Sequence, residues 1–288
     1  MTPYINAQQI IGYMESMKNE KQRQVLMKFF KTAPGDYGYG DEFIGLKVPQ
    51  TREVVKAVGM DFPLDEVPEL LMNHWHEVRL CGFLILVLKF EKLATKRLEN
   101  DVEAIKKRDD IVAMYLRYAG QASNWDLVDL SVHKILGHWL MLPTCLGKDS
   151  SVGADVKSAS KPGRSEISDS LQRSFKIGVL DNLANSSCLW KQRMSIVCSW
   201  KTSQQGDPSW CLRYAEIHLH HPHDLMHKAV GWMLREMGKR VSMDILRDFL
   251  RLHAHEMPRT MLRYAIEKMP EPERKEWMGI PADRFRHS

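Results

Sequence analysis

The sequence predicts an all-α protein in which short helices pack as stacked pairs. Apolar residues recur at spacings of three and four along almost the whole chain, which is typical of amphipathic helices. No run of alternating β-branched residues lies between turn signals, so strands are not expected. So many short helices do not suit one bundle, whereas stacked pairs bury a continuous core through contacts between neighbours. The expected helices cover about residues 6–18, 20–32, 50–59, 64–73, 75–92, 98–119, 124–140, 168–185, 189–201, 208–220, 223–238, 242–254 and 258–268.

A weak internal repeat supports the stacking. The segments EVRLCGFLIL, KQRMSIVCSW and MHKAVGWMLR each open with polar residues, carry a basic residue in third place and continue with an apolar run. The basic residues are Arg79, Arg193 and Lys228, and the last two are 35 positions apart. This spacing suits a two-helix repeat of the HEAT type. We therefore expect a curved α-solenoid of HEAT-like repeats that forms a single domain over residues 1–288.

Two segments interrupt the helical pattern. Residues 33–49 carry four glycines with Tyr37 and Tyr39, which predicts an ordered loop that crosses the surface. Residues 147–170 are rich in serine, glycine and charged residues and contain no aromatic residue, which predicts a mobile insert. A boundary between two domains is the competing interpretation, but the similar helical patterns on both sides favour an insert within one domain.

Composition sets only broad limits on function. The 288 residues include 41 Lys and Arg against 36 Asp and Glu, and a net charge of +5 neither requires nor excludes a polyanionic partner. The longest apolar run, residues 83–88, is too short to span a bilayer, and the N-terminal stretch lacks the order of a signal peptide. Five cysteines without a CxxC pair make a disulfide scaffold or a zinc ribbon unexpected. We expect a soluble intracellular protein.

The densest group of candidate functional residues is NWDLVDLSVHKILGHWL, residues 124–140. Asn124 is a natural N-cap, and Trp125 and Asp129 are four positions apart, so both project from one helix face. Asp126 lies about 100° around the helix from Trp125, so a smaller chemical role is expected for it. The alternative is structural: the two aspartates complement the positive helix N-terminus while Trp125 packs inward.

Several strings of the sequence together are similar to one family. They are HWHEVRLCGFLILV, NWDLVD, LWKQRMSIVCSW, HKAVGWMLREMGKR and HEMPRTMLRYAIEKM, and they resemble the DNA alkylation repair family, the AlkD-type alkylpurine DNA glycosylases, from about residue 8 to about residue 268. The resemblance implies a curved stack of HEAT-like helix pairs whose concave basic face binds duplex DNA. It also implies hydrolysis of the N-glycosidic bond of cationic N3- and N7-alkylated purines, with no metal and no organic cofactor.

The resemblance also implies roles for particular residues. The catalytic group would comprise the carboxylate of Asp129 and the rings of Trp125 and Trp232. A cationic purine leaves without protonation, so one carboxylate can stabilise the developing oxocarbenium ion and position water, while the tryptophans face the same charge. The residues expected to contact DNA are Arg193, Trp190, Tyr39, Lys228, Arg235, Lys239 and Arg263.

Other interpretations remain open. The expected partner is double-stranded DNA with alkylated purines, bound by a monomer in the cytoplasm or nucleoid, or in the nucleus of a eukaryote. A non-catalytic solenoid that binds DNA or protein through its concave face is the alternative. The arginines of the C-terminal third form either a solvated face or a phosphate-tracking surface. The string HLHHPH, residues 218–223, lacks nearby carboxylates, so no metal site is expected there.

Overall fold

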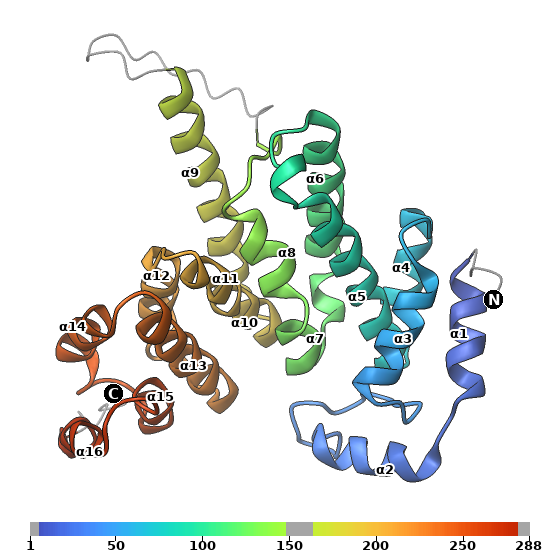
Figure 1. Ribbon diagram of the computed structural model, residues 1–288. Helices are drawn as coiled ribbons and strands as arrows, with labels where there is room; N and C mark the ends of the chain where they lie inside the picture. Colours follow the sequence, from blue (N-terminus) through green and yellow to red (C-terminus); the bar gives the residue numbers. More distant parts are fainter. Residues whose placement is uncertain (1–5, 148–163, 282–288) are drawn as a thin grey trace. The chain divides into compact units, whose positions relative to one another are not determined.

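The computed structural model describes residues 6–147 and 164–281 (Figure 1). Helices and their connecting loops make up this part of the chain, and the all-α prediction is confirmed. No strand occurs within it, and an isolated bridge pairs Glu42 with Trp75. None of its helices combines the length and the apolar character needed to cross a membrane. The chain divides into two compact units, the N-terminal unit (Met1–Ile135 with Leu142–Ser168) and the C-terminal unit (Leu136–Met141 with Asp169–Ser288).

The N-terminal unit is built around one buried helix, α5. Its elements are α1 (Ala7–Ser16), α2 (Glu20–Phe29), α3 (Val48–Val58), η1 (Leu64–Glu66), α4 (Val67–Leu71), α5 (His76–Leu93), η2 (Lys96–Leu98), α6 (Val102–Arg117), η3 (Ala119–Gln121), α7 (Trp125–Asp129) and the first part of α8 (Val132–Trp139). Because α5 is apolar on all sides, it packs against α3, α4 and α6 (Figure 1). Gly82 permits close contact with α4, since a Cβ there would lie 2.9 Å from Leu71 Cδ2.

Polar side chains fix where several of these helices begin. Asn19 Oδ1 accepts a hydrogen bond from the backbone N of Gln22 at 3.0 Å, and Asp101 Oδ1 accepts one from Ala104 at 2.8 Å. Each side chain satisfies a helix N-terminal N–H group that has no partner within the helix. The short Asn and Asp residues ahead of the apolar periods therefore determine the helix starts.

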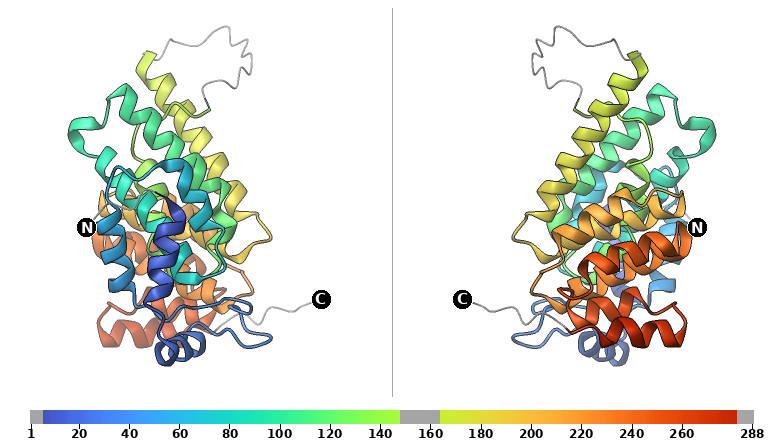
Figure 2. Two further views of the ribbon diagram at one scale, coloured as in Figure 1. Left: turned by 90° about the vertical axis from the view of Figure 1, so that its right-hand side faces the viewer. Right: turned by 90° about the vertical axis from the view of Figure 1, so that its left-hand side faces the viewer.

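The C-terminal unit is built around α13. Its elements are the last part of α8, α9 (Arg164–Ala184) from Asp169 onward, α10 (Leu189–Val197), α11 (Ser199–Gln204), α12 (Ser209–Ile217), α13 (Asp224–Arg240), α14 (Met243–His253), α15 (Arg259–Ala265) and α16 (Glu271–Gly279). Helix α13 packs against α10, α11, α14 and α15, and the orange and red helices lie in successive layers (Figure 2, right). Gly231 lets α13 approach α15 closely, because a Cβ there would overlap the carbonyl oxygen of Met261. Successive helices thus pack on their neighbours within each unit, as expected of stacked pairs.

The predicted helix over residues 124–140 is wrong in one respect, because it is two helices. Helix α7 ends at Asp129 and α8 begins at Val132. The buried hydroxyl of Ser131 donates to the carbonyl of Leu127 at 2.6 Å and lies 2.8 Å from the hydroxyl of Tyr115, while its backbone N–H bonds the carbonyl of Val128. A serine hydroxyl that binds the backbone in this way competes with regular helix geometry.

The glycine-rich loop departs from its prediction as well. Residues 33–40 lie mostly at the surface, as expected, but Phe43, Ile44 and Leu46 are buried. Gly45 has a φ of +99°, and a Cβ at this position would overlap the backbone of Asn19. The loop therefore dips into the core after Asp41 instead of crossing the surface along its whole length.

Further differences follow toward the C-terminus. The predicted helix over residues 189–201 is two helices, α10 and α11, which are separated at Cys198. Helix α16 is absent from the predicted set, because its sequence EPERKEWMG has no apolar stripe. Helix α9 begins at Arg164, so the end of the predicted insert is helical. Residues 148–163, the rest of that insert, lie outside the described residues. The single domain and its curvature stay predictions.

Candidate active site

Helix α7 carries Trp125 and Asp129 to a common cavity. The helix begins at Asn124, whose side-chain oxygen accepts a hydrogen bond from the backbone N of Trp125 at 2.9 Å. Both Trp125 and Asp129 are half-buried, and both line a cavity of about 390 Å³ in the N-terminal unit. Asp126, which is expected to lie about 100° around the helix from Trp125, lines the same cavity.

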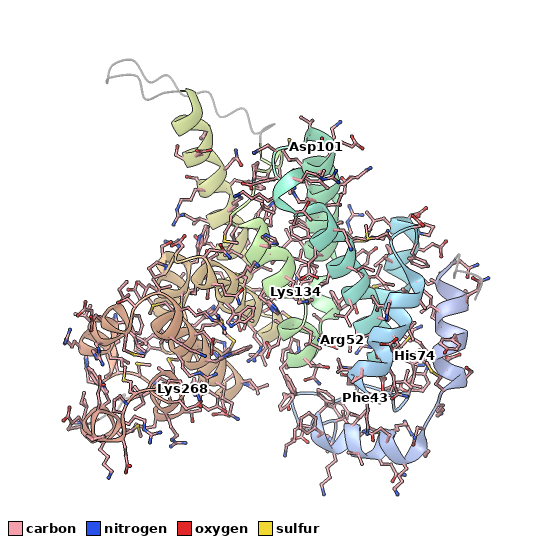
Figure 3. The ribbon with its side chains drawn as sticks, in the orientation of Figure 1. Phe43, Arg52, His74, Asp101, Lys134 and Lys268 are labelled. Atoms are coloured by element: carbon pink, nitrogen blue, oxygen red, sulfur yellow. The ribbon has the colours of Figure 1, made fainter. Side chains whose placement is uncertain are left out.

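The cavity has an apolar wall with a few charged side chains. It lies among α2, the loop that leads to α3, and the N-terminal turns of α3, α5 and α7. Figure 3 labels Phe43 on this loop. The lining residues are Leu26, Phe29, Phe30, Phe43, Leu46, Lys47, Val48, Pro49, His76, Glu77, Leu80, Trp125, Asp126, Asp129 and Leu130. A concave, largely apolar site with a few convergent polar groups is what ligand-binding sites usually provide.

A chain of rings holds Trp125 in place. The Phe30 ring lies 5.4 Å from the Trp125 ring, and Phe29 meets it edge-on at 5.9 Å. Phe30 also lies 5.0 Å from the His76 ring, which stacks on Phe43 at 4.5 Å. These centroid separations are those of favourable ring contacts. The indole of Trp125 is therefore packed by α2 as well as by its own helix.

At the wall of the cavity, His76 lies between two carboxylates. Its Nδ1 is 2.7 Å from Oδ2 of Asp41, and its Nε2 is 2.9 Å from Oδ2 of Asp126. All three side chains are buried. Burial works against the imidazolium, but the carboxylates of Asp126 and Asp41 outweigh burial and raise the pKa of His76 to about 9. His76 is therefore a buried cation at neutral pH.

Asp41 connects three segments of the N-terminal unit. It pairs with His76 and with Arg79, both on α5, and Nδ2 of Asn124 lies 3.5 Å from its Oδ2. Burial would raise the pKa of Asp41, but His76 and Arg79 lower it. Arg79 also donates to the hydroxyl of Ser123 at 3.2 Å. The loop, the start of α5 and the start of α7 are thereby joined through one carboxylate.

Glu77 fixes the part of the loop that lines the cavity. Its carboxylate accepts hydrogen bonds from the backbone N–H groups of Ile44, Gly45 and Leu46, each at 2.9 Å. Hydrogen bonds to an ionised acceptor are stronger than those between neutral groups. The buried Glu77 carboxylate therefore supplies the hydrogen-bond partners that the backbone of a loop inside the core would otherwise lack.

The importance of Asp41, His76 and Glu77 was not predicted from the sequence. A usable signal exists at the start of α5, where His76, Glu77 and Arg79 precede a long apolar run. Ionisable residues on a helix that is apolar on all sides require buried partners. The sequence does not identify those partners, because Asp41 and Asp126 lie 35 and 50 positions from His76.

The other predicted site residues fall on different elements. Tyr39 is 68% exposed on the loop of the N-terminal unit. Trp190 and Arg193 are both buried on α10, where Arg193 Nη1 donates to the carbonyl of Leu225 at 2.7 Å. Arg263 is exposed on α15.

Helix α13 carries four predicted site residues along one face. Lys228, Trp232, Arg235 and Lys239 follow one another at spacings of four, three and four. Trp232 is half-buried and Lys239 is exposed. Lys228 pairs with Asp224 at 2.7 Å, and Arg235 pairs with Glu267 in the turn after α15. The face therefore combines one aromatic ring with a row of cations.

The histidine string has structural partners. His218 Nε2 lies 2.8 Å from the Ser195 hydroxyl, and His221 Nε2 lies 2.9 Å from Oε1 of Gln192. Burial lowers the pKa of His218 to about 4, so this ring is neutral at neutral pH. Within residues 6–147 and 164–281, no group of three or more His, Cys, Asp or Glu side chains is arranged to hold a metal ion.

Comparison with known proteins adds the family. The model of the family described as DNA alkylation repair enzyme matches residues 10–147 and 167–269, which leaves out most of the predicted insert. No curated protein matches the chain. Since the two matched segments make up most of its length, the chain belongs to the DNA alkylation repair enzyme family.

Proposed function

We propose that the protein is a DNA glycosylase that hydrolyses the N-glycosidic bond of cationic N3- and N7-alkylated purines in duplex DNA. One observation carries the proposal: Trp125 and Asp129 line the same cavity of the N-terminal unit. A carboxylate beside an electron-rich ring suits a reaction in which positive charge develops on a sugar. Membership of a DNA alkylation repair family supplies the substrate class.

In this proposal Asp129 is the catalytic carboxylate. An alkylated purine that already carries a positive charge leaves as a neutral base, so no general acid has to protonate it. The glycosidic electron pair goes to the base, and the sugar acquires oxocarbenium character. Asp129 stabilises that cation and accepts a proton from the water that attacks the anomeric carbon.

Trp125 and Trp232 contribute the faces of their rings. A ring face attracts a nearby cation, and the attraction is stronger where water is excluded. Trp125 is held by Phe29 and Phe30, so its ring is already oriented before DNA binds. Because both rings would meet the sugar, the base stays stacked and is not enclosed in a pocket, in contrast to base-flipping enzymes.

Binding to DNA is proposed to use phosphate contacts without sequence readout. The exposed cations among the predicted residues are Lys239 and Arg263, and Tyr39 is an exposed ring that can lie against the backbone. Phosphate contacts fix register without distinguishing bases. We further propose that the protein acts as a monomer inside the cell, where genomic DNA is its partner.

The test is base release from defined duplexes. The protein is incubated with one duplex that contains 7-methylguanine and a second that contains uracil, and the free bases are quantified. Release of 7-methylguanine with retention of uracil supports the proposal, because only the cationic base leaves without protonation. Release of uracil at a similar rate would instead require an enzyme that activates neutral bases.

A further inference from the structure

Helix α7 cannot hold its own position. It has only five residues, and a helix of that length is unstable in isolation. A buried side-chain contact joins it to α5: Asp126 Oδ2 lies 2.9 Å from His76 Nε2, beside the buried apolar residues Leu127 and Val128. Since Trp125 precedes Asp126 directly and Asp129 follows one turn later, this contact helps to set where both candidate catalytic side chains lie.

The contact requires His76 to carry both ring protons. A neutral imidazole has one donor nitrogen and one acceptor nitrogen, whereas the imidazolium has two donors. Both His76 nitrogens face carboxylate oxygens, Asp41 on one side and Asp126 on the other. Loss of either proton would turn a nitrogen lone pair toward a buried anion.

Burial makes the arrangement sensitive to that proton. The His76 side chain is 2% exposed, and the side chains of Asp41 and Asp126 are 3% and 6% exposed, so water cannot replace a lost hydrogen bond. Oδ1 of Asp126 is also buried and has no hydrogen-bond partner among the described residues. An unpaired carboxylate at this depth is strongly destabilising.

His76 reaches Trp125 by a second route. Its ring packs on Phe30, and Phe30 packs on Trp125. The other charged groups that face this cluster are Arg79, which binds Asp41, and Glu77, which is engaged by the loop backbone. Arg79 also reaches Ser123, which precedes α7, whereas His76 contacts Asp126 within α7 itself.

We propose that His76 and Asp126 are positioning residues: the buried chain from Asp41 through the His76 imidazolium to Asp126 holds α7 so that Trp125 and Asp129 have their catalytic placement. The proposal rests on the proposed glycosylase function for its kinetic consequence. In this role His76 and Asp126 do not touch the DNA or take part in bond breaking, and their effect on the reaction depends on pH. Deprotonation of His76 would release α7 and slow base release without weakening DNA binding.

The kinetic experiment compares full-length wild-type protein with His76→Gln and Asp126→Asn. Single-turnover release of 7-methylguanine and the affinity for the duplex are measured from about pH 6 to about pH 10. The matched control is His218→Gln, another buried histidine with a hydroxyl partner, located in the C-terminal unit. A stability loss alone would affect the control in the same way as the His76 variant.

The wild-type rate is expected to fall on the alkaline side as His76 loses its proton. Asp126→Asn removes one of the two anions that stabilise the imidazolium. The alkaline fall of the pH–rate profile should therefore move at least one pH unit lower, and the rate at neutral pH should drop about 10-fold. In His76→Gln the rate should no longer fall on the alkaline side, and the DNA affinity should be unchanged. The proposal would be overturned if both folded variants kept the alkaline fall of the wild type at the same pH and had rates within twofold of the wild type.

A second measurement separates this proposal from the glycosylase assignment. Nitrogen-15 NMR of labelled histidine in the wild-type protein reports whether His76 carries two ring protons at pH 7.5, and the His76→Gln spectrum assigns its signals. If His76 carries two ring protons but the protein releases no base, the buried Asp41–His76–Asp126 arrangement is supported and the proposed glycosylase function is refuted. A neutral His76 ring in an active enzyme would refute the positioning role alone.

Discussion

Trp125 lines the cavity with its ring against Phe29 and Phe30. We expect Trp125→Ala to slow excision about 10-fold, which corresponds to the loss of one desolvated ring–cation contact. The factor should be similar for a methyl adduct and for a bulky N3 or N7 adduct, because the ring would meet the sugar common to both. Single-turnover rates on the two duplexes check this, with Trp277→Ala on α16 as the control. A loss confined to bulky adducts would show that Trp125 contacts the lesion instead.

His76 gives a stability prediction of its own. Its pKa in the folded protein is raised to about 9, above the unfolded value near 6.5, so its contribution is complete below pH 6.5 and is lost as pH rises toward 9. Unfolding by urea should therefore become easier by on the order of 2 kcal/mol between pH 6.5 and pH 8.5. His218 is neutral in both states over most of this range, because its pKa is lowered.

The control for this titration is the His76→Gln variant. It should show a much smaller change over the same pH range, and its stability should be closest to that of the wild type at pH 8.5. Buried thiols such as Cys81, whose pKa burial raises, also lower stability as the pH rises, but they do so equally in the variant and in the wild type. Equal pH dependence in the variant and the wild type would assign the effect to another group.

At the residue scale, the sequence predicts pairs within a helix better than pairs between segments. The proximity of Trp125 and Asp129 follows from a spacing of four. The partners of His76 do not follow from any spacing, since they are brought together only by the buried loop and by the start of α7. For the same reason the sequence assigns Asp126 a minor role, whereas the structure gives it a buried cation as partner.

At the element scale, Gly231 sets the packing of α13 on α15. We expect Gly231→Ala to destabilise the protein by about 1–3 kcal/mol, because the added methyl would overlap the Met261 carbonyl and lie 2.6 Å from Tyr264 Cβ. Gly178→Ala on α9 is the matched control, since nothing lies within 4 Å of its Cβ position. There the helix propensity of alanine should leave stability unchanged or raise it. Urea unfolding measures the stability of both variants. An equal change in the free energy of unfolding for the two would contradict the close approach of α13 and α15.

Helix positions were predictable where apolar periodicity is strong and less so elsewhere. Helices α5 and α13 follow from their apolar runs, whereas α16 lacks such a run and was missed. The break between α7 and α8 depends on one serine hydroxyl whose buried partner is Tyr115 of α6. Tertiary contacts of this kind leave no periodic signal in the sequence.

At the scale of the whole molecule, the proposed phosphate contacts predict salt-dependent DNA binding. The affinity for undamaged duplex should fall steeply from about 50 mM to about 200 mM salt, because phosphate contacts release counterions. Lys239→Ala should reduce the slope of log affinity against log salt by about one unit. Lys106→Ala, an exposed lysine on α6, is the control. Binding that hardly changes with salt would favour the protein-binding scaffold.

The family follows from several strings together, while the chemistry rests on one carboxylate. Asp129→Asn keeps the shape of the side chain and removes its charge, so base release should nearly vanish, and DNA affinity should be unchanged or higher because an anion near the phosphates is gone. Asp248→Asn, an exposed aspartate on α14, controls for the loss of a negative charge.

The decisive measurement is the single-turnover release of 7-methylguanine from a defined duplex by wild-type protein and Asp129→Asn, assayed together on folded samples. The wild type is expected to release the base, and the variant is expected to lose at least about 100-fold in rate with equal or tighter DNA binding. Release by the variant at the wild-type rate, or no release by a wild-type protein that binds the duplex, would contradict the proposed glycosylase function.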